Sequence, residues 1–204
     1  MAGDASFLDH GNVEPHAGLL KQPAAGRQLF KIMRAGDLVR SVKGSYLHFQ
    51  RVDSYKDFPR ADARDGEQLP QDRALNAGVR FSEAPDYSAA DYYDSCRART
   101  YACSFSLENS PHIWQHYGVG DPVGKVCVVF DFDKLRAALN ATISNAPGRS
   151  ALMVGNLQCK QIFQINYGLV EYADAAVKRL SGERLPNPIL YAYLKDAAFR
   201  SEED

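Results

Sequence analysis

The sequence predicts an α+β fold: a single domain with a mixed central sheet, or sheets, and short flanking helices. The chain has 204 residues, of which 45% are hydrophobic and 24% charged, as in ordinary soluble proteins with one core. The predicted strands cluster around short helices and do not alternate with them at a regular spacing. This order argues against a doubly wound parallel sheet and favours α+β.

The N-terminal residues 1–27 contain glycine, proline and isolated hydrophobic residues without a period. Such a segment cannot bury a continuous apolar face, so we expect it to be loosely ordered. The single α+β domain is then expected to occupy residues 28–204.

Two strands and a helix are predicted at the start of this domain. Residues 29–33 have the pattern of a short strand, and the residues that follow have apolar side chains at helical spacing up to Gly44. Residues 45–50 alternate apolar and polar side chains, which predicts a second strand with unlike faces.

The stretch from 51 to 73 is dense in charge and is broken by Pro59, Gly66 and Pro70. A loop of this length in a compact domain usually carries a function or is mobile. Its charges are mixed, so it is not a phosphate-binding run. Residues 86–97 that follow have a helical pattern.

The centre of the chain predicts a strand, a short helix and a turn. Apolar and small residues alternate over 101–106, as in a strand. Ser110 and Pro111 have the N-cap and first-turn arrangement of a helix, which we expect to run through Tyr117. The glycines of 118–124 predict a turn-rich loop.

A strand is predicted at 125–130, and its continuous apolar run at 126–130 suggests that it is buried on both faces. Asp131 or Asp133 can cap the next helix, in which apolar residues repeat from Leu135 to Ile143. After a loop at 145–149, we expect a strand over 163–169 and a terminal helix over 188–195.

The composition excludes several classes of protein. No stretch approaches the roughly 18 apolar residues of a membrane span, and the mixed, acidic N-terminus is unlike a secretory signal, so a cytoplasmic location is predicted. The formal net charge of −1 gives no strong signal for nucleic acid. The four cysteines lack a Cys-x-x-Cys pair and are expected to be reduced and mostly buried: Cys96, Cys103, Cys127 and Cys159.

The glycine run at 118–124 superficially resembles a dinucleotide-binding motif. It is one residue too long, and it follows a predicted helix and enters a predicted strand. A pyrophosphate site needs the reverse order, with a strand leading into a helix N-terminus. We therefore discard a Rossmann interpretation.

Two pairs of residues have spacings that could serve a metal ion. His112 and His116 share a helix face, but no third ligand can be named, so two partly exposed helix histidines are the favoured interpretation. Asp131 and Asp133 would point to one side of a strand end, but helix capping accounts for at least one of them. We expect no metal.

Trp114 and Tyr117 are the aromatic residues of greatest interest. They lie three positions apart on a short predicted helix and could stack on a base or a nicotinamide ring. The alternative is that both anchor this helix to the sheet. Cys103 lies between aromatic residues with no visible cation, which argues for packing and against a nucleophile.

The central stretch resembles a bacterial and phage family known as domain-of-unknown-function family 2971. The family shows a strand ending in Cys-Phe-Ser, then Met-Trp-x-x-Tyr, then a glycine before a hydrophobic strand ending in Phe-Asp. The matching segments here are Cys103-Ser104-Phe105-Ser106, Ile113-Trp114-Gln115-His116-Tyr117, Gly124 and Val128-Val129-Phe130-Asp131. Ile113 replaces the usual methionine, and one serine is inserted after the cysteine.

The resemblance extends over residues 29–204. Upstream, 44–57 and Asp65-Gly66 look like the family's strand and acidic loop. At the far end, Lys195 and 199–204 look like the start of a segment that continues in relatives into another strand. We therefore expect the domain to be truncated at its C-terminus.

The family's order of elements looks similar to ADP-ribosyltransferase-like domains of toxins and phage defence, in which NAD is the substrate. The resemblance implies nucleotide-binding residues that are small and polar or aromatic: Ser104 or Ser106, Trp114 and Tyr117. It also implies an acidic catalyst, Glu202 or Glu203, that stabilises the developing ribosyl cation.

Three functions stay open from the sequence. The first is an NAD-using transferase of toxin or phage-defence type. The second is a non-catalytic regulatory module of phage defence, which would bind a protein partner through the loop at 51–73. The third is a metal-dependent phosphodiesterase that would use two histidines and two aspartates: His112, His116, Asp131 and Asp133.

Overall fold

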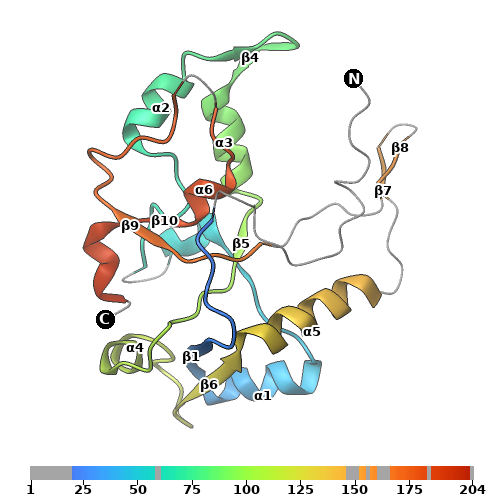
Figure 1. The fold of residues 1–204 in the computed structure, drawn as a ribbon, viewed down its shortest axis with the longest axis vertical. Helices are drawn as coiled ribbons and strands as arrows, with labels where there is room; N and C mark the ends of the chain where they lie inside the picture. Colours follow the sequence, from blue (N-terminus) through green and yellow to red (C-terminus); the bar gives the residue numbers. More distant parts are fainter. Residues whose placement is uncertain are drawn as a thin grey trace. The chain divides into compact units, whose positions relative to one another are not determined.

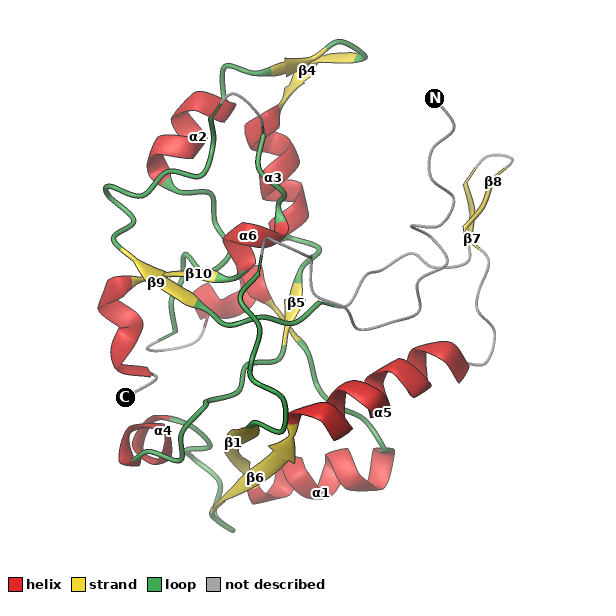
Figure 2. Ribbon diagram, in the orientation of Figure 1, coloured by secondary structure: helices red, strands yellow, loops and turns green. Residues whose placement is uncertain are grey.

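A computed structural model of the chain describes residues 20–57, 61–145, 152–154, 157–159, 166–182 and 185–202 (Figure 1). The described residues form helices and small sheets, so the fold is α+β (Figure 2). Every sheet in this part of the chain has two strands, and the expected central sheet is not among them. None of the described helices has the length and apolar character that crossing a membrane requires.

The chain folds into two compact units. Unit 1 comprises residues 1–28 and 130–169, and unit 2 comprises residues 29–129 and 170–204. Of the segment expected to be loosely ordered, residues 1–19 lie outside the described part of the structure. Both units are therefore discontinuous in sequence.

Unit 1 contains the helix α5 (Phe132–Asn145) and the antiparallel strands β7 (Leu152–Val154) and β8 (Leu157–Cys159). The side chain of Asp131 accepts a 3.0 Å hydrogen bond from the backbone N–H of Lys134. This bond satisfies one of the N–H groups that a helix start leaves unpaired. Helix capping by Asp131 is thus confirmed.

The strand expected at 163–169 is not found in its described residues, which begin at 166 and have no regular secondary structure. The ring of Tyr167 packs edge-on against Phe132, with 5.0 Å between ring centroids. The guanidinium of Arg136 lies over the same Tyr167 ring. Ring contacts of this kind, rather than strand pairing, hold Tyr167. The predicted loop at 145–149 lies outside the described residues after Asn145.

Unit 2 begins with β1 (Gln28–Arg34) and α1 (Ala35–Gly44), and β1 pairs with β6 (Lys125–Asp131). The strands expected at 29–33 and 125–130 are confirmed. Burial of β6 on both faces was wrong: its residues are half-buried, and Val129 is 51% exposed.

Two predicted strands are much shorter than expected. Instead of 45–50 and 101–106, only β2 (Gln50–Arg51) and β5 (Tyr101–Ala102) form, as an antiparallel pair. Tyr101 is 57% exposed, so the apolar face predicted for it is not buried. Alternation of side chains stabilises a strand only where a partner and a covered face are present.

The charged stretch from 51 to 73 is partly helical. It contains the 3₁₀ helix η2 (Val52–Asp57) and the start of α2 (Pro70–Asn76), in which Pro70 occupies the first turn. Proline is favoured there because the N–H it lacks would have no partner. Further along, the first three residues of the helix predicted at 86–97 belong instead to a strand.

That strand is β4 (Ala84–Ser88), which forms an antiparallel pair with β3 (Arg80–Phe81) and leads into α3 (Ala89–Arg97). Ser88 caps α3: its hydroxyl accepts the N–H of Asp91, whose carboxylate accepts the N–H of Ser88. This reciprocal capping box explains why the helix begins three residues later than its sequence pattern.

The predicted short helix is confirmed as α4 (Pro111–His116). The side chain of Ser110 accepts the N–H of Ile113, and Ile113 is 3% exposed. Beyond α4, Gly118, Gly120 and Gly124 have positive φ angles, as the predicted turn-rich loop requires.

The C-terminal part of unit 2 contains β9 (Glu171–Ala173), α6 (Ile189–Ala192), β10 (Leu194–Asp196) and the 3₁₀ helix η3 (Ala197–Glu202). Strand β10 pairs with β9 in parallel. The helix expected at 188–195 is therefore limited to α6, because its last residues join a sheet.

The core of unit 2 lies where α2, α3 and α6 meet. Its buried residues are Leu69, Ala89, Tyr93 and Tyr191. The rings of Tyr93 and Tyr191 meet edge to face at 5.3 Å, and the Tyr93 hydroxyl donates to the carbonyl of Pro186 at 2.6 Å. Burial raises the pKa of Tyr93 to about 12, so its hydroxyl keeps the proton that this bond requires.

A fully buried carboxylate ties this core to the C-terminal segment. Asp72 accepts the backbone N–H groups of Leu180 and Ser181 at 2.8–3.0 Å, and it accepts the Tyr191 hydroxyl at 3.0 Å. Beside it, Asn76 accepts the hydroxyl of Ser181 at 3.1 Å. Burying a carboxylate is costly unless its lone pairs are satisfied, and here they are.

Replacing Asp72 by alanine is expected to lower the free energy of unfolding by about 3 kcal/mol or more, because two backbone N–H groups and one hydroxyl lose their buried acceptor. Urea unfolding followed by circular dichroism measures this change. Asp86→Ala, at an exposed position of β4, is the matched control and should be nearly neutral. Equal midpoints for the two variants would contradict the role assigned to Asp72.

Candidate functional site

The long loop, the chain that follows β5 and strand β10 bring four polar residues together in unit 2. We name this group the Lys195 cluster: Tyr55, Asp65, Ser104 and Lys195. They come from three stretches far apart in sequence. Of the four, only Ser104 is among the site residues that were expected from the sequence.

A tight turn positions Asp65. The N–H of Asp65 donates to the carbonyl of Asp62 at 3.1 Å, and the N–H of Arg64 donates to the Asp62 carboxylate at 2.9 Å. Gly66 follows with a φ of +72°, and a Cβ there would lie 2.8 Å from Val52. Glycine is therefore required at this position both by the backbone conformation and by the close contact.

Asp65 pairs with Lys195, the middle residue of β10. The Lys195 Nζ lies 3.5 Å from the Asp65 Oδ2, and these side chains are only 15% and 7% exposed. An ion pair this well shielded from water would leave a costly buried charge if one partner were lost. The pair therefore fastens the loop to β10.

Tyr55 lies beside this pair and reaches Ser104. Burial is the main cause that raises the pKa of Tyr55, and the negative charge of Asp65 adds to it, whereas Lys195 and a hydrogen bond from Ser104 oppose it. The phenol is thus protonated at neutral pH and remains a hydrogen-bond donor. Ser104 itself is exposed.

Cys103 has a cation nearby that the sequence did not reveal. Lys31 on β1 hydrogen-bonds to the Cys103 thiol, and its Nζ donates to the carbonyl of Ser104 at 2.8 Å. Burial nevertheless raises the pKa of Cys103 more than Lys31 lowers it. The thiol is therefore protonated at neutral pH, in agreement with a packing role.

Of the four cysteines, Cys96, Cys103 and Cys127 are free and only half-buried, not mostly buried as expected.

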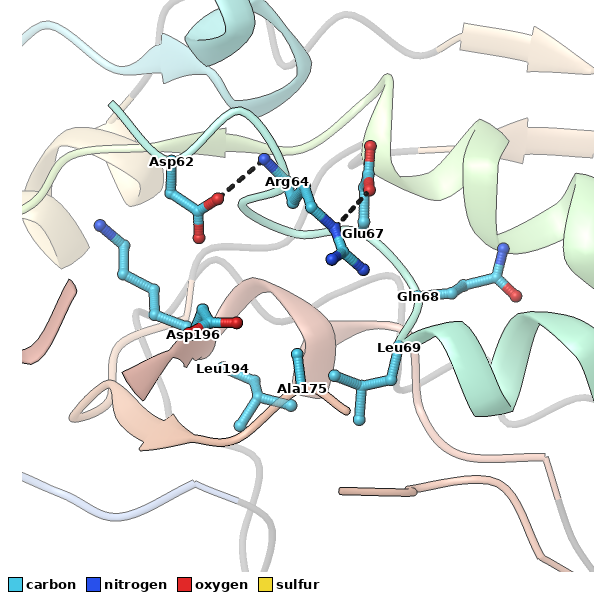
Figure 3. Close-up of a pocket in the computed structure, with 9 residues that line it drawn as sticks. Asp62, Arg64, Glu67, Gln68, Leu69, Ala175, Leu194 and Asp196 are labelled. Carbon is cyan, nitrogen blue, oxygen red and sulfur yellow. Dashed lines mark hydrogen bonds and ion pairs between the residues drawn. The ribbon is translucent and has the colours of Figure 1, made fainter. Parts of the chain in front are cut away.

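A small pocket lies against the cluster (Figure 3). Residues of the long loop line one side, and residues of β10 and the chain after β9 line the other. Its lining residues are Asp62, Arg64, Glu67, Gln68, Leu69, Ala175, Leu194, Lys195 and Asp196. Its volume of about 30 Å³ accommodates a water molecule and is far below that of a ligand pocket.

Trp114 lies on α4, and Tyr117 follows the last residue of this helix. Trp114 is half-buried, its indole N–H donates to the Asn109 side chain at 2.6 Å, and its carbonyl accepts the ammonium of Lys125. Tyr117 is 42% exposed. These contacts anchor the end of α4 while leaving part of both rings at the surface.

Helix α4 contacts η3, the segment that ends at Glu202. The carboxylate of Asp196 accepts the N–H of Ala198 at 2.9 Å and so begins η3 directly after β10. The side chain of Glu202 and all of Glu203 lie outside the described part of the structure. Helix α4, which carries Trp114, and η3, which includes the backbone of Glu202, are therefore neighbours.

Ser106 has a local role. Its backbone exchanges two hydrogen bonds with Phe30, and its hydroxyl donates to the carbonyl of Glu108 at 2.7 Å and accepts the N–H of Glu108 at 3.1 Å. These bonds form a turn typical of serine. Of the two serines proposed for a cleft, Ser104 is the one joined to the Lys195 cluster.

The rings of His112 and His116 lie together, with 4.3 Å between centroids, so the predicted shared face is confirmed. In unit 1, the Asp133 carboxylate accepts the N–H of Gly26 at 2.7 Å, in addition to the capping bond of Asp131. Among the described residues, no three side chains of histidine, cysteine, aspartate or glutamate form a group suited to a metal ion.

Comparison of the chain with protein-family models, with curated proteins and with solved structures found no match.

Sequence reasoning missed the partnership of Tyr55, Asp65 and Lys195. Tyr55 and Asp65 lie in a charged segment, and nothing in the sequence around Lys195 indicates which residue pairs with it. The one available signal was Asp65-Gly66 in a loop too long for a connector, because a glycine after an acidic residue marks a tight turn that can present it.

The raised pKa of Cys103 predicts slow alkylation by iodoacetamide at mildly alkaline pH, because the thiolate is the reactive form. Replacing Lys31 by methionine removes the charge that lowers this pKa, so the reaction should slow further, by roughly twofold or more. Residue-resolved mass spectrometry measures the rates. Lys43→Met, at an exposed position of α1, should leave the rate unchanged; a faster reaction in Lys31→Met would contradict the assignment.

Proposed function

We propose that unit 2 is an NAD-using, ADP-ribosyltransferase-like enzyme of the toxin or phage-defence type that the resemblance to family 2971 implies. The observation that carries the proposal is the contact of η3 with α4. It supports convergence of Trp114 with the segment that ends at Glu202. Strand β10, which precedes η3, is linked to Ser104 through Lys195, Asp65 and Tyr55.

NAD would bind along the outer side of α4 and η3. The 30 Å³ pocket is too small for a dinucleotide, so the nucleotide would lie where Tyr117 and Ser104 are exposed. A half-buried indole held by Asn109 offers a fixed flat surface for a nicotinamide or adenine ring. Fixed aromatic surfaces bind flat rings at a low cost in conformational entropy.

The chemistry would proceed by breaking the bond between nicotinamide and ribose. The bond's electrons leave with nicotinamide, so positive charge develops on the ribosyl carbon and its ring oxygen. A carboxylate of Glu202 or Glu203 would stabilise this charge. The nucleophile of an acceptor then bonds to the ribosyl carbon and releases its proton to water or to the same carboxylate.

Binding is tested first. The chain has a single tryptophan, so selective excitation of indole reports on Trp114 alone. We expect NAD to change this emission in a saturable way and to give a matching isotherm in calorimetry. Absence of both signals would overturn the proposed binding site.

Turnover is tested by nicotinamide release and by transfer of labelled ADP-ribose to added protein or nucleic acid. Replacing Glu202 and Glu203 together by glutamine should lower turnover about a hundredfold or more, with NAD affinity nearly unchanged, because the lost charge acts in the transition state. Glu83→Gln, at an exposed turn, is the matched control with wild-type turnover. Equal turnover in the double variant would exclude these glutamates as the catalyst.

A further inference from the structure

One arginine holds the loop side of the Lys195 cluster in place. Arg97, the last residue of α3, is 14% exposed at its side chain. Its Nε donates to the carbonyl of Asp65 at 2.9 Å, and its Nη2 donates to the carbonyl of Ala63 at 2.6 Å. Its Nη1 donates to the Glu67 carboxylate at 2.9 Å.

The three acceptors belong to Ala63, Asp65 and Glu67, so they lie on Asp65 and on a residue at either side of it. A guanidinium suits such a set because its donors have a fixed planar geometry, whereas a lysine ammonium is a single flexible point charge. The turn at Asp65 contributes its own short-range bonds, and Arg97 connects this turn to a helix through a side chain with three hydrogen bonds.

We propose that Arg97 is a positioning residue: it holds Asp65 where its carboxylate pairs with Lys195. Lys195 lies in β10, and η3 starts two residues later. By fixing Lys195, Arg97 sets the start of the segment that ends at Glu202. Arg97 would hold Asp65 whether or not the protein uses NAD, but the consequence for catalysis rests on the proposed function.

The reactivity of Lys195 tests the geometry without any nucleotide. Acetylation of a lysine requires access and a free amine, and Lys195 is shielded and ion-paired. Arg97→Lys is expected to raise the acetylation rate of Lys195 about fivefold or more, the factor expected when a contact of ordinary strength is lost. Residue-resolved mass spectrometry of the folded protein measures the rate.

A double-mutant comparison shows whether Arg97 acts through Asp65. Asp65→Asn should raise the same rate. Adding Arg97→Lys to it should have little further effect, because both changes act on Lys195 through the same ion pair with Asp65. Independent, multiplying effects would overturn the proposal. An unchanged rate in Arg97→Lys would also overturn it.

Two controls separate positioning from general loosening. Lys125, whose ammonium is bound by the carbonyls of Trp114 and Tyr117, should keep its rate in Arg97→Lys; an equal rise at both lysines would contradict a positioning role. Arg99→Lys is the matched variant, since Arg99 is exposed and its Nε donates to the nearby Ser95 carbonyl at 3.0 Å. It should leave Lys195 unchanged.

Should Arg97→Lys not fold, Glu67→Gln weakens the same arrangement by removing the charge of one acceptor. It should raise the Lys195 rate about twofold, a smaller effect than loss of the whole guanidinium. No rise would overturn the proposal.

If the wild-type protein does not bind NAD, the proposed function fails while these outcomes still decide the geometry. If NAD is turned over and folded Arg97→Lys keeps the wild-type kcat, the catalytic consequence fails alone.

Discussion

The structure of unit 2 depends on one buried carboxylate. Asp72 lies in α2, and its acceptors are filled by two backbone N–H groups 108 and 109 residues further along the chain and by the Tyr191 hydroxyl. Without these donors, the free-energy cost of burying the Asp72 carboxylate would be too high for the fold to bear. The donors exist only when the C-terminal segment lies against α2. Asp72 therefore makes the formation of the core and the placement of β9, α6 and β10 a single event.

The Lys195 cluster is a consequence of that placement. Once β10 lies beside β9, Lys195 faces the loop that leads into α2, and Asp65 can reach it. The loop is also held by the guanidinium of Arg97. Fixed charges thus surround Tyr55, whose protonated hydroxyl meets Ser104.

Much of the local structure could be predicted from short-range patterns. Ser110 and Pro111 mark the start of α4, Asp131 caps α5, and the glycines after α4 have the conformations that a turn requires. Such features depend on a few adjacent residues. The failures concern long-range partners: residues 45–50 have a strand pattern, yet only Gln50 among them pairs with another strand. The pairing of Asp65 with Lys195 could not be predicted for the same reason, because it joins residues 130 positions apart in the sequence.

The sequence separation of Asp72 from its donors has a consequence for biosynthesis. Asp72 leaves the ribosome 108 residues before Leu180, the first of its donors, so its acceptors stay without these partners until residues 180–191 have been made. Until then, a nascent chain that buried Asp72 would bury an unpaired charge, so early collapse of this region is disfavoured. Packing of the core around Asp72 therefore has to wait until residues 180–191 have been made, and until then the ring of Tyr93 stays accessible to holdase chaperones.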